Sequence, residues 1–173
     1  MKIPNSNTKI KISEKANVRE TAEIMGKMIA VESKKQYVHE LAKKLCVNKQ
    51  TPLSSAMVLC NFAFHTATFE PDVNGVQVIK TPAATIRTKK GNCVDYTVLI
   101  GSIAKAAGIP VIIKVVAIGD QAEYGHVYPI VNGLSCDVVP YQKQDGTEYL
   151  YRTGKEVVYP TEKEYNKYFL VEI

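Results

Sequence analysis

One cysteine stands at the start of the best-defined helical pattern in this chain. Apolar residues recur at helical spacing after the stretch Gly91-Asn92-Cys93-Val94-Asp95-Tyr96, and Gly108-Ile109-Pro110 ends the pattern. The spacing predicts a buried helix from Cys93 to about Ala107. A cysteine in the first turn of a helix lies among unpaired backbone N–H groups at the positive end of the helix dipole, and both stabilise a thiolate. Cys93 is therefore a candidate nucleophile, with a buried, inert cysteine as the alternative.

Three strand patterns follow this helix, and a hairpin signal joins the last two. Residues 111–118 form a β-branched run that is typical of a buried strand, and Gly119-Asp120 then turns the chain. Residues 124–131 and 134–139 have strand patterns on either side of Asn132-Gly133, a pair that favours a two-residue turn. The pattern predicts antiparallel strands.

The predicted hairpin places His126 and Asp137 on neighbouring strands. With a two-residue turn, His126 faces position 139, which is two residues beyond Asp137. A diagonal offset or a bulge would bring the carboxylate within reach of the imidazole. The expected arrangement is a nucleophile at a helix start, a base on one strand and an orienting carboxylate on the next.

The first half of the chain carries helix signals, and four helix starts are marked by capping residues or proline. They lie at Asn17 with Glu20, Ser33 with Gln36, Thr51-Pro52 and Thr81-Pro82. We expect Asn48 to close the second helix and Thr88 to end the fourth. The predicted apolar face of the third helix holds Leu53, Ala56, Met57, Cys60, Ala63, Phe64 and Ala67.

Length and composition fit one domain with its own core. The chain has 173 residues, and we expect a flexible segment over residues 1–16 and a single domain over residues 17–173. The net charge of +5 is spread along the chain without interleaved aromatic residues, which argues against a nucleic-acid surface. Because no apolar stretch could span a bilayer and the first residues lack the apolar part of a signal peptide, we expect a cytoplasmic protein or one packaged in a virion.

The last part of the chain, residues 141–173, is rich in tyrosine. Asp145-Gly146 signals another hairpin, with strands expected at 148–152 and 156–159 and a last strand at 169–173. The tyrosines could line a peptide-binding groove or a protein interface, or they could be amphipathic residues of half-exposed edge strands. The sequence leaves both alternatives open.

Four motifs in this order resemble the core of the transglutaminase-like superfamily, a group of papain-related folds that includes thiol peptidases and amide-hydrolysing or acyl-transferring enzymes. They are Gly-Asn-Cys-Val-Asp-Tyr-Thr-x-Leu, Ala-Gly-Ile-Pro, Gly-His-Val-Tyr and Asp-Val-Val-Pro. The resemblance covers roughly residues 60–140 and is nearest to small single-domain members from tailed bacteriophages and prophages, in which a segment similar to Phe69-Glu70-Pro71-Asp72 precedes the cysteine. It implies an α+β fold in which a helical N-terminal half packs on an antiparallel sheet.

The resemblance also assigns roles to single residues. It implies Cys93 as nucleophile, His126 as general base and acid, and Asp137 as the residue that orients the imidazole. Such sites need a second oxyanion donor besides the backbone, and Asn92 and Gln77 are the candidates. We expect neither a metal nor another cofactor, because the cysteines show no Cys-x-x-Cys spacing and a thiol mechanism needs none.

The expected function is that of a cysteine-dependent amide hydrolase, a peptidase or isopeptidase that works through a thioester. Three alternatives stay open: a non-catalytic virion or assembly protein of a bacteriophage, a protein-crosslinking acyltransferase, and an arylamine-type acetyltransferase. The expected partners are a peptide or protein substrate and other virion proteins, with neither nucleic acid nor membrane.

Overall fold

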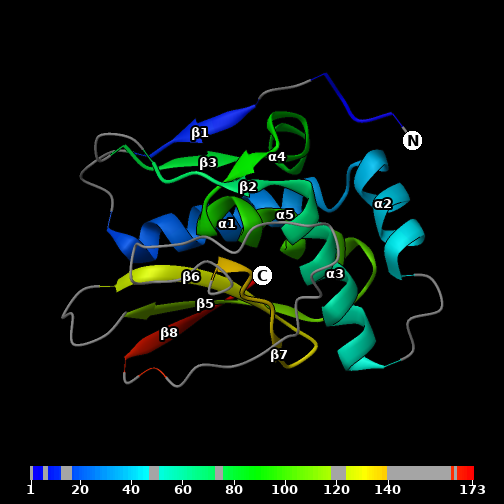
Figure 1. Ribbon diagram of the computed structural model, residues 1–173. Helices are drawn as coiled ribbons and strands as arrows, with labels where there is room; N and C mark the ends of the chain where they lie inside the picture. Colours follow the sequence, from blue (N-terminus) through cyan, green and yellow to red (C-terminus); the bar gives the residue numbers. More distant parts are fainter. Residues whose placement is uncertain are drawn as a thin grey trace.

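The computed structural model describes residues 2–5, 8–12, 17–46, 51–72, 76–117, 124–139, 165 and 167–173. These residues form five helices and eight strands, arranged as Figure 1 shows. In chain order they are β1 (Lys9–Lys11), α1 (Val18–Glu32), α2 (Gln36–Cys46), α3 (Pro52–Thr66), β2 (Thr68–Phe69), β3 (Val78–Lys80), α4 (Pro82–Thr88), β4 (Lys90–Gly91), α5 (Cys93–Ala106), β5 (Val111–Ala117), β6 (Tyr124–Val131), β7 (Leu134–Ser135) and β8 (Tyr168–Glu172).

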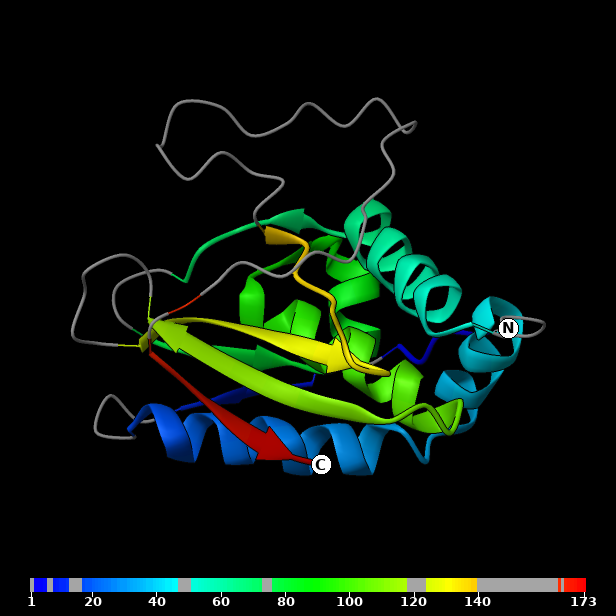
Figure 2. The same cartoon turned by 90° about the horizontal axis from the view of Figure 1, so that it is seen from below.

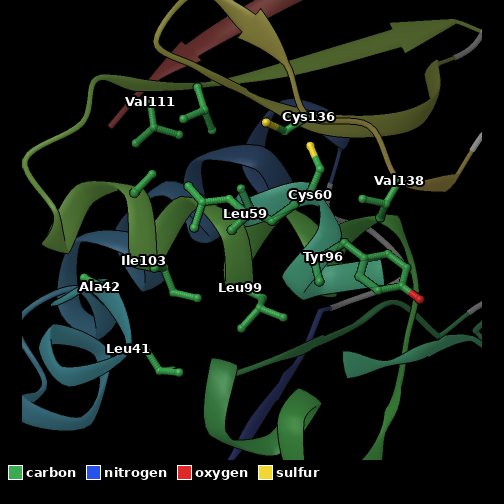
Figure 3. Close-up of a cluster of buried hydrophobic side chains, with 14 of the residues drawn as sticks. Leu41, Ala42, Leu59, Cys60, Tyr96, Leu99, Ile103, Val111, Cys136 and Val138 are labelled. Atoms are coloured by element: carbon green, nitrogen blue, oxygen red, sulfur yellow. The ribbon is translucent and has the colours of Figure 1, made fainter. Parts of the chain in front are cut away.

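Helix α5 is the centre of the fold. Every residue from Val94 to Ala104 is buried, and the helix contacts all four other helices as well as β5 and β6. Its apolar side chains enter two separate clusters: Leu99 and Ile103 belong to the one drawn in Figure 3, whereas Val98 belongs to a second cluster with α1 and β5. A helix held on all sides in this way gives its first residue, Cys93, a fixed position.

The main sheet has four antiparallel strands in the order β7-β6-β5-β8. The helices lie along one side of this sheet, as the two views of Figures 1 and 2 show. The predicted α+β fold with an antiparallel sheet is therefore confirmed. Two further pairs, β1 with β3 and β2 with β4, lie on the far side of α5 from the sheet.

The hairpin between β6 and β7 begins as predicted and ends earlier. Asn132 and Gly133 have φ values of 51° and 82°, the left-handed values that a two-residue turn of this kind needs, and Val131 pairs with Leu134. The predicted strand over 134–139 is wrong beyond Ser135. The N–H of Cys136 still donates to the carbonyl of Pro129 at 2.8 Å, but proline has no N–H to return, so the ladder stops.

The helix starts agree with prediction at three of the four positions. Asn17 and Thr51 cap α1 and α3 with capping boxes, and Thr81 caps α4. The capping box predicted at Ser33 is wrong, because the Ser33 hydroxyl donates to the carbonyl of Ala30 at 3.1 Å and its N–H closes α1. Helix α2 begins at Gln36, and the predicted stop at Asn48 lies outside the described residues.

The predicted apolar face of α3 is confirmed at Ala56, Cys60, Ala63, Phe64 and Ala67, which are all buried, and it differs at two positions. Leu53 is exposed and Met57 is half-buried, whereas Leu59, which the pattern did not single out, is fully buried. The helix turns this side toward α5 and β7. The predicted short helix from Thr81-Pro82 is confirmed and ends at Thr88 as expected.

Segments near both ends of the chain pair with strands of the fold. Part of the stretch expected to be flexible, residues 1–16, is strand β1, which pairs antiparallel with β3, and Ile12 is buried behind it. The predicted last strand is confirmed as β8, and the expected hairpin at Asp145-Gly146 lies outside the described residues. Among the described helices, none is long and apolar enough to cross a membrane.

Candidate active site

Cys93 is the first residue of α5, and its side chain is half-buried. The preceding residue, Asn92, caps the helix: its Oδ1 accepts from the N–H groups of Val94 at 3.0 Å and Asp95 at 3.2 Å. In the part of the chain that the structure describes, nothing accepts from the N–H of Cys93 itself. That donor therefore remains available at the positive end of the helix, beside the sulfur.

A buried carboxylate fixes this helix start to strand β3. Asp95 accepts from the N–H of Asn92 at 3.2 Å, and from the N–H and Nζ of Lys80 at 2.8 Å and 3.1 Å. Burial raises the pKa of Asp95, and the hydrogen bonds and charge of Lys80 oppose that rise. A Cβ on Gly91 would lie 3.0 Å from the Cβ of Asp95, so a larger residue there would press against the Asp95 side chain.

His126 and Asp137 form the buried polar pair of the site. His126 Nε2 and Asp137 Oδ2 are 2.7 Å apart, and the two side chains are 4% and 7% exposed. The other oxygen, Oδ1, accepts from the N–H of Val139 at 3.1 Å. The contact arises because the chain leaves the ladder after Ser135, so Asp137 reaches His126 without a regular strand pair.

The imidazole of His126 is held in its charged form. Burial alone would lower its pKa, but hydrogen bonds and charge interactions with Asp137 and Cys93 outweigh burial and raise the pKa to about 10. Because Nε2 contacts Asp137, the nitrogen left for Cys93 is Nδ1. An imidazolium at this place can stabilise negative charge that develops on the sulfur.

A cavity of about 220 Å³ lies in front of Cys93 and His126. Gln77, from the stretch before β3, lines it together with these two side chains, whereas Asn92 does not. Both candidate amides are held by one carboxylate: Asp72 Oδ2 accepts from Gln77 Nε2 at 2.6 Å and from Asn92 Nδ2 at 2.9 Å. Sequence reasoning gave Asp72 no role, although it lies in the segment noted before the cysteine.

The two oxyanion candidates, Asn92 and Gln77, differ in the hydrogen bonds that their side chains already make. Asn92 is buried and uses its oxygen to cap α5. Gln77 keeps one amide hydrogen after its bond to Asp72, and its side chain borders the space in front of Cys93. Gln77 is therefore the better placed of the two to donate into the cavity.

A family model described as the transglutaminase-like superfamily matches residues 39–146, which is more than half of the chain. The chain belongs to the transglutaminase-like superfamily. Members of this superfamily are typically cysteine-dependent hydrolases or transferases, and the matched region contains Cys93, His126 and Asp137. No curated protein and no solved structure matches the chain.

In a superfamily of cysteine enzymes, the other three cysteines are competing candidates for the nucleophile. Cys60 and Cys136 are fully buried in the cluster of Figure 3, where the two side chains lie close together. Hydrogen bonding to Cys136 and burial raise the pKa of Cys60, so its thiol stays protonated. Cys46 is the last residue of α2, so it does not lie at a helix start. Cys93 combines a helix start with an interaction with the His126 imidazole, which makes it the strongest candidate of the four.

Proposed function

We propose that the protein is a cysteine-dependent amide hydrolase that cleaves peptide or isopeptide bonds through a thioester on Cys93. The observation that supports this best is the buried His126–Asp137 pair beside a cysteine at a helix start. A cysteine with these neighbours has both a base to deprotonate it and donors to stabilise an oxyanion.

The proposed reaction has two halves. In the reactive pair the proton of the Cys93 thiol already lies on His126, and the Cys93 thiolate attacks the carbonyl carbon of the substrate amide. The oxyanion that forms accepts from the N–H of Cys93 and from the amide of Gln77. When it collapses, the C–N bond breaks, His126 gives its proton to the leaving amine, and a thioester remains on Cys93.

Water completes the cycle. His126, now neutral, takes a proton from a water molecule whose oxygen attacks the thioester carbon. The C–S bond then breaks, the carboxylic acid leaves, and the Cys93 thiolate remains beside the protonated His126. An amine in place of water would give acyl transfer by the same steps. Cys93 is only half-buried, so water can reach the thioester, and this favours hydrolysis.

Acylation by an activated ester tests the proposal without knowledge of the natural substrate. With p-nitrophenyl acetate, we expect a burst of one p-nitrophenolate per chain, and peptide mapping should place a hydroxylamine-labile acetyl group on Cys93. Labelling of another cysteine, or acetylation of lysines alone, would contradict the proposal and would favour the non-catalytic alternative.

The proposed role of Gln77 as an oxyanion donor can be tested with the same reagent. We expect Gln77→Ala to lower the ratio of the acetylation rate to the iodoacetamide alkylation rate by about a hundredfold, because only the first reaction forms an oxyanion. Gln36→Ala is the matched control, since Gln36 is exposed at the start of α2. A ratio that is the same in Gln77→Ala and Gln36→Ala would exclude Gln77 as an oxyanion donor.

A further inference from the structure

The cavity in front of Cys93 extends beyond the residues that take part in the proposed reaction. Beyond the cysteine, histidine and glutamine, its walls are largely apolar, with side chains from Ile12, Val18, Ala22, Met25, Val115 and Val127. No Asp, Glu, Lys or Arg side chain of the described residues lines it. Away from His126, a charged group that entered this cavity would lose its hydration without gaining a partner of opposite charge on the apolar walls.

One wall of the cavity is a face of helix α1. Val18, Ala22 and Met25 follow one another at helical spacing along that face. Met25 is almost fully buried, whereas Val18 is 40% exposed although it is apolar. Val18 therefore lies toward solvent and Met25 toward the core, and the small side chain of Ala22 leaves room between them.

The volume matches a single large apolar group. The cavity measures about 220 Å³. An apolar protein cavity of roughly 150 Å³ is known to hold one benzene molecule. The space beside Cys93 can thus take the side chain of a leucine, methionine or phenylalanine, and a glycine or alanine would leave most of it unfilled.

We infer that this cavity is a specificity subsite for a large apolar side chain next to the carbonyl that Cys93 attacks. The inference rests on the proposed function, since it names the substrate class of the same site. The substrate is then a peptide or amide with a leucine-, methionine- or phenylalanine-sized group there, and acidic or basic groups at that place are selected against.

Alkylating reagents of graded shape can test the subsite directly. In each reaction the Cys93 thiolate displaces iodide: a C–S bond forms, the C–I bond breaks, and iodide leaves with the electron pair. We expect N-benzyliodoacetamide to react with Cys93 about tenfold faster than iodoacetamide, with each rate taken relative to glutathione. N-(carboxymethyl)iodoacetamide should react more slowly than iodoacetamide on the same scale.

Two variants on α1 should remove this preference. Ala22→Leu fills the cavity, and Val18→Gln places a polar group where the wall is partly exposed; each should lower the benzyl-to-unsubstituted ratio about threefold or more. Val31→Gln is the matched control, because Val31 is an exposed valine on the same helix that does not line the cavity, and it should keep the wild-type ratio. If Ala22→Leu fails to fold in a thermal melt, Val18→Gln still decides.

The outcomes separate this inference from the proposed function. If Cys93 reacts no faster than glutathione with any reagent, the reactive thiolate itself is absent and the proposed function fails. If Cys93 is reactive toward iodoacetamide but shows no benzyl preference, or if Val31→Gln changes the ratio as much as Val18→Gln does, only the apolar subsite is wrong.

Discussion

Replacing Cys93 with alanine is expected to abolish amide turnover while leaving the fold intact. Loss of the nucleophile removes the covalent route, and in a well-studied serine protease the equivalent loss costs about 10⁶-fold in kcat. The fold should survive because the cap of α5 uses the side chain of Asn92 and not the sulfur, which is half-buried. Turnover of a peptide or glutaminyl-amide substrate, measured beside a thermal melt, checks both parts.

Cys136→Ala is the demanding control for this result. Cys136 directly precedes Asp137, yet its sulfur points into the core, where it donates to the carbonyl of Ala56 at 3.6 Å. Its replacement should cost about 1 kcal/mol of packing energy and leave turnover within a few-fold of wild type. Full activity in Cys93→Ala, or loss of activity in Cys136→Ala, would show that the wrong cysteine has been assigned.

Asp137→Asn is expected to lower kcat/KM by about 10⁴-fold, a smaller loss than that of the nucleophile. An amide at position 137 can still contact the imidazole, but it favours the wrong tautomer and no longer supports the imidazolium. Since Asp137 raises the pKa of His126 through a hydrogen bond and through its charge, the variant should have a lower His126 pKa.

The pH profile tells this role apart from a merely structural one. In the wild type, the imidazolium persists until the pH passes the pKa of about 10, so the alkaline limb of kcat/KM should lie there. In Asp137→Asn that limb should move to lower pH. Glu172→Gln removes an exposed carboxylate on β8 and is the control. An alkaline limb that stays in place in Asp137→Asn would remove Asp137 from the site.

The sequence predicts the helices, strands and turn of the site better than it predicts the contacts between them. The turn at Asn132-Gly133 and the whole of strand β6 follow from local preference, because positive φ at both turn positions is a demand that few residue pairs satisfy. The early end of β7 depends on a single missing N–H at Pro129, a residue of the opposite strand. A local pattern in residues 134–139 cannot contain that information.

The carboxylates around the cysteine were also beyond sequence reasoning. Asp95 completes the capping box of α5, and its bonds to Lys80 reach a strand residue that lies 15 positions earlier in the chain. Asp72 binds Gln77, which is 5 residues away, and also Asn92, which is 20 residues away. Ser33 was mispredicted for a local reason. Its hydroxyl can bind either the end of α1 or the start of α2, and the pattern assigned it to α2, whereas it donates to Ala30 of α1.

The most direct test of the central claim is the rate at which Cys93 is alkylated near neutral pH, with and without its imidazole partner. All four cysteines should be followed by mass spectrometry after brief exposure to iodoacetamide. We predict fast labelling of Cys93 alone in the wild type, and labelling of Cys93 in His126→Gln that is slowed to the rate of an ordinary exposed thiol. Slow, uniform labelling of the wild type, or equal rates in the two proteins, would contradict a thiolate–imidazolium pair between Cys93 and His126.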